Sequence, residues 1–317
     1  MLEAMPNRSG AIDLVRIIAV AAIVAGHAFT REVTADWLYT WHVTVFFVIS
    51  GYLWKPGRSM RAELSRRWQS LGRPYLVWFV LLTIALLAMG FPDTPDRILG
   101  GLYGGGVAGM PYITLWFIST LFFTALLLRL IERLPLAVQW LIGIAGAAAG
   151  WVGGTVLSDS PLGVGLAFTS LIYLLIGDGL RRIRARIPAP AVIGILLIAV
   201  SAALVAAGAS SFLDMKQGEF GTPVLSLVVS AAISIGLILL AESTVRPGRL
   251  SQLCTLLALP LLTVVLMHPL FLWTPWSGWP TFITAMLVPL LVGLVALRTP
   301  ASPWLTGQAA LRVDSGG

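Results

Sequence analysis

Charged residues and cysteine are both scarce in this sequence. Asp, Glu, Lys and Arg make up 11% of its 317 residues, against 57% hydrophobic residues. An average soluble domain carries about 25% charged residues, so the composition excludes an ordinary water-soluble fold. The single cysteine, Cys254, excludes a disulfide framework and a thiolate metal cluster. What recurs along the chain is apolar runs of about 17–25 residues, each long enough to cross a bilayer as a helix.

The first apolar run contains Asp13, Arg16 and His27. A cleavable signal peptide does not carry such groups in its hydrophobic stretch, so we expect this run to be a membrane helix. Apolar runs and the turn-forming residues between them predict about ten helices in all. The expected ranges are 12–30, 38–54, 74–90, 112–131, 136–157, 162–180, 189–208, 221–242, 250–273 and 277–298. We therefore predict an all-α, polytopic transmembrane bundle that forms a single membrane domain over residues 1–317.

The net charge of +7 at pH 7 predicts sidedness rather than a nucleic-acid partner. With a cytoplasmic N-terminus and about ten spans, 18 of the 21 Lys and Arg residues fall on the inner side of the membrane. The three that fall outside are Arg31, Arg97 and Lys216. Basic residues gather in cytoplasmic loops of membrane proteins. The pattern predicts a multi-pass protein of the cytoplasmic membrane with both termini inside.

Small residues are dense in the expected helix 136–157. Gly146, Gly150 and Gly154 recur there at four-residue spacing. Such a stripe lets two membrane helices approach closely, so these glycines predict helix packing.

Three ionisable residues lie within the first expected helix. Such groups cost about 2.5–3.5 kcal/mol each at a membrane helix centre, which makes them functional candidates. Asp13 and Arg16 are three residues apart on one face, and a structural ion pair or an anchor at the inner interface would also explain them. His27 follows Arg16 by about three turns, or about 16 Å along the axis, and faces nearly the same way.

The spacing of Arg16 and His27 suits a long ligand with an anionic end. A guanidinium group donates paired hydrogen bonds to phosphate, and imidazole is a common general base. Coenzyme A has this form, with phosphates at one end and a thioester at the end of a pantetheine arm. The alternative is that His27 only hydrogen-bonds to a neighbouring helix.

Two consecutive segments resemble one known family. "IDLVRIIAVAAIVAGH" resembles the opening motif of the membrane-bound acyltransferase-3 family, in which ten residues separate Arg and His, as between Arg16 and His27. "WHVTVFFVISGYL" resembles the family's second-helix pattern, with His42, Ser50 and Tyr52 at its positions. "SRRWQSLGRPYLVW" and "LWFISTLFF" resemble its basic segment and fourth helix. The resemblance covers about residues 11–125, while 136–298 rests on helix count and a weaker match at "LMHPLF".

The resemblance implies an acyltransferase that moves an acyl group, commonly acetyl, from acyl-CoA to hydroxyls of cell-surface carbohydrates or glycolipids. It implies that His27 is the catalytic base and that Arg16 contacts the CoA phosphates. Ser70 stands where relatives often carry a second basic residue, so which loop arginine meets phosphate stays open. The further donor-side candidates are Arg66, Arg67, Arg73 and Tyr52, with Asp13 and Ser50 in supporting positions.

The basic segment also predicts an amphipathic helix at the inner interface. Met60, Leu64, Trp68 and Leu71 form an apolar stripe at helical spacing. Arg67 falls on the same side, where a buried arginine requires an anionic partner. Arg58 and Arg61 are interpreted as lipid-headgroup anchors.

All three histidines are expected in the outer half of the membrane. We interpret His42, Trp116 and His268 as candidate acceptor contacts. No metal is expected, because no Asp, Glu or Cys is spaced to complete a site with them. Asp13 lies about 21 Å from His27 in a straight helix, so the group that orients the imidazole is left open, with Glu32 and Asp36 as candidates.

Two other functions compete with acyl transfer. A secondary transporter also fits helices with a few buried charges, but the second half shows no repeat of the Arg and His pattern. A membrane scaffold does not explain Arg16 and His27. Direct transfer and a covalent acyl intermediate both stay open. The acceptor is open too, and an arginine-rich, high-GC composition makes a glycolipid such as trehalose monomycolate one candidate.

Overall fold

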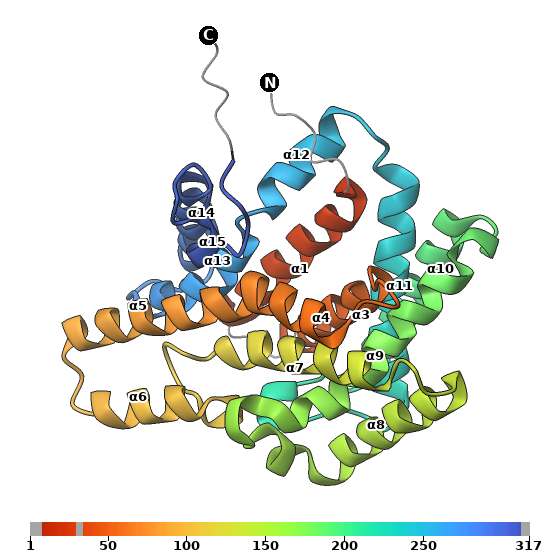
Figure 1. The fold of residues 1–317 in the computed structure, drawn as a ribbon, viewed down its shortest axis with the longest axis horizontal. Coiled ribbons are helices and arrows are strands. Elements are labelled where there is room, and N and C mark those ends of the chain that lie inside the picture. Colours follow the sequence, from red (N-terminus) through yellow and green to blue (C-terminus); the bar gives the residue numbers. More distant parts are fainter. Residues whose placement is uncertain (1–7, 30–33, 312–317) are drawn as a thin grey trace.

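The computed structural model describes residues 8–29 and 34–311, and the regular elements in these ranges are all helical. Each expected helix has a helical counterpart (Figure 1). The longer α-helices are α1 (Gly10–Ala28), α3 (Thr44–Tyr52), α4 (Met60–Arg67), α5 (Arg73–Met89), α6 (Thr94–Tyr103), α7 (Leu115–Ile131), α8 (Leu136–Ser158), α9 (Val164–Ile183), α10 (Pro190–Ala206), α11 (Leu225–Thr244), α12 (Arg249–Ala258), α13 (Leu261–Met267) and α14 (Trp279–Ala296), followed by the short α15 (Ser302–Leu305).

Seven helices of the described chain are long and apolar enough to cross a membrane, and α7 and α10 are shorter apolar helices. An all-helical, multi-pass membrane fold is therefore confirmed, whereas the number of ten spans stays a prediction. The expected helix 250–273 differs in detail, because it breaks at Pro260 between α12 and α13 and tightens into a 3₁₀ segment, η7 (His268–Trp273). Helix α6 has no counterpart among the expected helices.

Helix α1 lies at the centre of the bundle, between α12, α11, α13 and α3 (Figure 1). Ser9 caps its N-terminus by accepting a hydrogen bond from the Ile12 amide at 3.5 Å. Its side chains alternate between tightly packed positions, such as Val15 and Val24, and the face that lines the cavities described below. The position of α1 brings its ionisable residues into the interior.

Glycines set the closest helix contacts. A Cβ atom on Gly51 of α3 would overlap the Leu174 carbonyl of α9, and one on Gly177 of α9 would overlap the Val48 carbonyl of α3. A Cβ on Gly146 of α8 would likewise overlap the Phe168 carbonyl of α9. The predicted role in helix packing is confirmed for Gly146, where α8 and α9 touch backbone to backbone. Gly150 lies near the side chains of Thr169 and Phe220, and Gly154 lies against the Gly218 carbonyl, between α10 and α11.

The segment between α10 and α11 folds back over the bundle. It includes the short 3₁₀ turn η6 (Met215–Gln217). The Lys216 ammonium donates to the Gly106 carbonyl at 2.8 Å, and the Ser158 hydroxyl donates to the Lys216 carbonyl. These bonds hold the turn against the α6–α7 connection and the end of α8.

The two ends of the described chain meet. Arg8 donates to the Gln308 side chain at 3.3 Å, and the Leu311 amide donates to the Leu297 carbonyl at 2.8 Å. The ends therefore lie on the same side of the bundle, as an even number of crossings requires. That this side is the cytoplasm stays a prediction.

Candidate active site

One face of α1 lines two cavities in succession. Arg16, Val20, Ile23 and His27 follow one another at spacings of three or four residues, which places them on one helical face. Arg16 and Val20 line a cavity of about 560 Å³, here called the inner cavity. Ile23 and His27 line a second cavity of about 220 Å³, the outer cavity. Arg16 and His27, whose spacing suits a long ligand with an anionic end, thus lie beside two adjoining cavities.

Arginines from three segments line the inner cavity. They are Arg8 before α1, Arg16 in α1, and Arg66 and Arg67 in α4. Asp13 is fully buried and accepts from Arg16 at 2.7 Å and from Arg8 at 2.9 Å. This carboxylate orients both guanidinium groups. The N–H groups of Arg8 and Arg16 that it does not bind can donate to an anion.

The carboxylate of Glu63 holds the two α4 arginines in position. This buried carboxylate accepts from Arg67 at 2.8 Å and from Arg66 at 3.2 Å. Arg129 of α7 reaches the same carboxylate at 3.3 Å. The expectation that buried Arg67 has an anionic partner is confirmed. Arg58 also pairs with Glu63, at 2.6 Å, which adds a role to the predicted headgroup anchor.

The other donor-side candidates occupy different positions. Ser50 lines the inner cavity and accepts from Arg67 at 3.0 Å. Arg73 lies over the Trp304 ring at 5.2 Å, and the Tyr52 hydroxyl donates to Glu242 at 2.6 Å. The structure brings Arg16, Arg66, Arg67 and Ser50 together, whereas Arg73 and Tyr52 line neither cavity.

His27 makes a hydrogen bond with His268, 241 residues away. The atoms Nδ1 of His27 and Nε2 of His268 are 2.9 Å apart. Nδ1 of His268 lies 3.0 Å from the Val264 carbonyl, which can only accept, so that nitrogen carries a proton. With both rings neutral, Nε2 of His268 is an acceptor and Nδ1 of His27 is the donor. Nε2 of His27 then keeps its lone pair, as a general base requires.

This bond supplies the orienting partner that the sequence leaves open. Of the two candidates named from sequence, Glu32 lies outside the described residues, and Asp36 is exposed. His268 is fully buried at the end of α13, where the chain leaves the α-helix before Pro269. No local pattern could pair it with α1, because the contact depends on how α13 packs against that helix.

The outer cavity is lined by polar groups from three parts of the chain. His42 and Trp116, two predicted acceptor contacts, both line it, as does Thr114. The Thr114 hydroxyl is buried and has no hydrogen-bond partner among the described residues. The η6 segment adds Asp214, Lys216 and Gln217.

Two of the groups in the η6 segment have shifted acidities. Burial raises the pKa of Asp214 above its ordinary value, and burial lowers the pKa of Lys216. Both shifts reflect charged groups held away from bulk water. Hydrogen-bond donors and acceptors of this kind suit an acyl-accepting substrate that carries hydroxyl groups.

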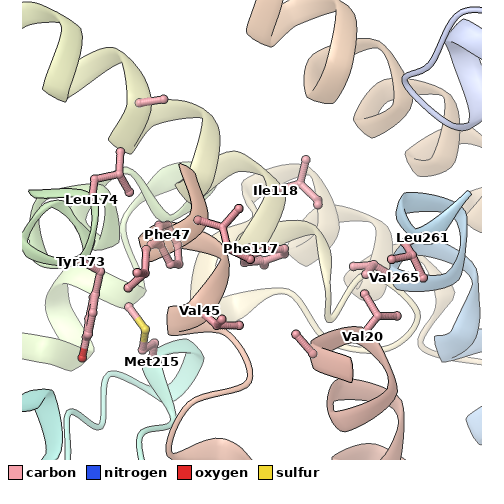
Figure 2. Close-up of a cluster of buried hydrophobic side chains, with 14 of the residues drawn as sticks. Val20, Val45, Phe47, Phe117, Ile118, Tyr173, Leu174, Met215, Leu261 and Val265 are labelled. Carbon is pink, nitrogen blue, oxygen red and sulfur yellow. The ribbon is translucent and has the colours of Figure 1, made fainter. Parts of the chain in front are cut away.

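Phe117 of α7 and Val265 of α13 line both cavities and form the wall between them. Both side chains are buried. Figure 2 shows Phe117 between Phe47 of α3 and Val265. The Phe117 ring packs at 5.3 Å from Phe46 and 5.9 Å from Phe47, edge to face. The wall is therefore anchored on the α3 side.

Several lining residues carried no sequence signal. Arg8 was one basic residue among many near the inner side, and Gln308 lies after the last expected helix. The η6 residues lie in a connection whose fold cannot be read from apolar periodicity. Phe117 and Val265 look like ordinary core residues in apolar helices.

No curated protein and no solved structure matches this chain. A family model does match, over residues 9–306, and it is described as an acyltransferase domain. That match spans α1 to α15. It includes both members of the histidine pair, the lining of the outer cavity, and the lining of the inner cavity apart from Arg8, Gly307 and Gln308. The chain belongs to the membrane acyltransferase-3 family.

Proposed function

We propose that this acyltransferase moves a short acyl group, acetyl in the first instance, from cytoplasmic acyl-CoA to a hydroxyl of an extracytoplasmic carbohydrate or glycolipid. The observation that carries the proposal is the placement of Arg16 and His27 on one face of α1, beside two cavities that share a wall. The arginine-lined inner cavity suits the phosphates and pantetheine arm of the donor. The polar outer cavity suits the acceptor hydroxyl.

The proposed chemistry uses the neutral tautomer described above. Nε2 of His27 takes the proton of the acceptor hydroxyl as its oxygen attacks the thioester carbon. The new C–O bond forms, the C–S bond breaks, and the CoA thiolate takes up a proton from the imidazolium. His268 keeps Nδ1 of His27 as the donor throughout. In this scheme Asp13 and Glu63 hold the arginines that position the donor.

The experiment compares envelope extracts from a deletion strain that expresses either the intact protein or the His27→Ala variant. We expect carbohydrates or lipids with one added acyl group only with the intact protein. Loss of a general base lowers the rate by about 10²–10⁴-fold. Purified His27→Ala protein should still bind CoA, because Arg16 and the α4 arginines are unchanged. Full acyl transfer by this variant would overturn the role of His27.

The same extracts separate acyl transfer from transport. A secondary transporter would move its substrate across the membrane without a covalent change. An acyltransferase leaves a chemically modified acceptor, and the mass spectrum identifies it. Glycolipids such as trehalose monomycolate are among the acceptors to be tested in this way.

A further inference from the structure

The wall between the two cavities has a position that bears on substrate choice. On α1, Val20 lines the inner cavity, and Ile23, one turn later, lines the outer cavity. Phe117 and Val265 line both. An extended ligand that runs from the arginines toward His27 lies against these side chains. They are the apolar side chains that the two cavities share, between the arginines and His27.

The length of the donor places its reacting carbon near this wall. Arg16 and His27 are about 16 Å apart along α1, comparable with an extended pantetheine arm. With phosphates at Arg16, the thioester lies at the level of His27. The acyl chain extends further than the thioester, so it projects into the outer cavity or folds back against the wall.

The two cavities offer unequal room. The outer cavity measures about 220 Å³, against about 560 Å³ for the inner one. The outer cavity has to hold both the acyl group and the part of the acceptor that carries the hydroxyl. Each methylene added to the acyl chain therefore competes with the acceptor or presses on Phe117 and Val265.

The wall is held in place, so it does not yield easily. The Phe117 ring is fixed between Phe46, Phe47 and Trp116, with ring centroids 5.3–6.3 Å away. Val265 is 4% exposed and lies next to fully buried Val264 and Leu266 in α13. A close-packed wall resists extra volume, because displaced side chains leave their preferred rotamers.

We propose that Phe117 and Val265 set the length of the acyl chain, and that the wall they form restricts this enzyme to short acyl groups. The proposal rests on the acyl-CoA donor of the proposed function. It assigns Phe117 and Val265 to specificity rather than to the chemical step, since neither has a group that can exchange a proton.

The test measures binding of free CoA and of acetyl-, butyryl-, hexanoyl- and octanoyl-CoA to the full chain in lipid nanodiscs. We expect the intact protein to bind free CoA and acetyl-CoA comparably. The affinity should then fall by about tenfold or more for each methylene group of the acyl chain that the site cannot accommodate. Phe117→Ala should restore hexanoyl-CoA binding relative to free CoA, so that the ratio of the two affinities approaches the ratio for acetyl-CoA and free CoA. The control, Phe123→Ala, removes a phenyl ring from the same helix at a position that lines neither cavity, and it should behave like the intact protein.

Val265→Ala is a second wall variant that removes less side-chain volume. It allows the same measurement if Phe117→Ala does not fold. Chain-length preference that stays the same in a folded wall variant would overturn the proposal. So would equal affinity of the intact protein for all chain lengths. Failure of the proposed function looks different, because the intact protein would then not bind free CoA at all.

Discussion

At the scale of single residues, the most informative contact is the one between His27 and His268. Two neutral imidazoles can share only one hydrogen bond, so the Val264 carbonyl decides which nitrogen of each ring carries a proton. A catalytic dyad usually pairs imidazole with a carboxylate, which also stabilises the imidazolium. A second imidazole fixes the tautomer without placing a negative charge in the membrane.

Substitution of His268 should lower turnover without weakening the donor complex. We expect His268→Leu to reduce kcat by about 100-fold or more, with the KM for acyl-CoA little changed, since the arginines remain in place. His268→Gln retains an acceptor oxygen near the position of Nε2 and should recover part of kcat. Equal losses in the two variants would indicate a packing role only. Steady-state kinetics with an identified acceptor makes the comparison.

At the scale of helices, backbone contact between α3 and α9 holds the second half of the family motif in place. Gly51 lies in that motif, next to Ser50 of the inner cavity and Tyr52. Its counterpart on α9 is Gly177. A side chain at either position would separate the two helices and shift Ser50 from Arg67.

Two glycines on α9 provide a matched pair for this contact. Gly177→Ala would place a methyl group against the Val48 carbonyl and should destabilise the protein by about 1–3 kcal/mol. Gly179→Ala places its methyl group 3.7 Å from Trp140, an ordinary contact, and should be neutral or stabilising by up to about 1 kcal/mol. Thermal unfolding in detergent gives both values. Equal melting temperatures would argue against backbone contact as the basis of the packing.

Glu63 joins α4 to α7 through arginines. Glu63→Gln would leave Arg67 and Arg129, at 8% and 2% side-chain exposure, without their shared carboxylate. Removal of one partner from a buried ion pair costs about 3–5 kcal/mol. We expect a lower melting temperature together with weaker CoA binding. Asp93→Asn, which removes an exposed pair with Arg97, is the control and should change neither.

At the scale of the whole molecule, the contact between Arg8 and Gln308 places the two ends of the described chain on one side of the bundle. Reporter fusions can test whether that side is the cytoplasm. Fusions that fluoresce only in the cytoplasm should be active at both termini, and a fusion after Gly208, before η6, should be inactive. The distribution of Arg and Lys is the physical reason. An active reporter at Gly208, or opposite results at the two termini, would contradict the topology.

The sequence predicts the helices and one half of the site because both have local signals. Apolar runs locate the spans, and the positions of Arg16 and His27 place two functional groups on one face. The sequence predicts His268 as a candidate acceptor contact but does not pair it with His27, because that contact depends on tertiary packing. Arg8, Gln308 and the η6 segment lack periodicity altogether, so only the folded chain brings them to the cavities.

The wall of Phe117 and Val265 also has an electrical consequence. In the proposed topology, the inner cavity faces the cytoplasm and the outer cavity faces the other side, so water could approach the wall from both. Apolar constrictions of this kind exclude water and stop ions even where they are thin. Two side chains would then let the enzyme pass an acyl group between compartments while the membrane keeps its voltage.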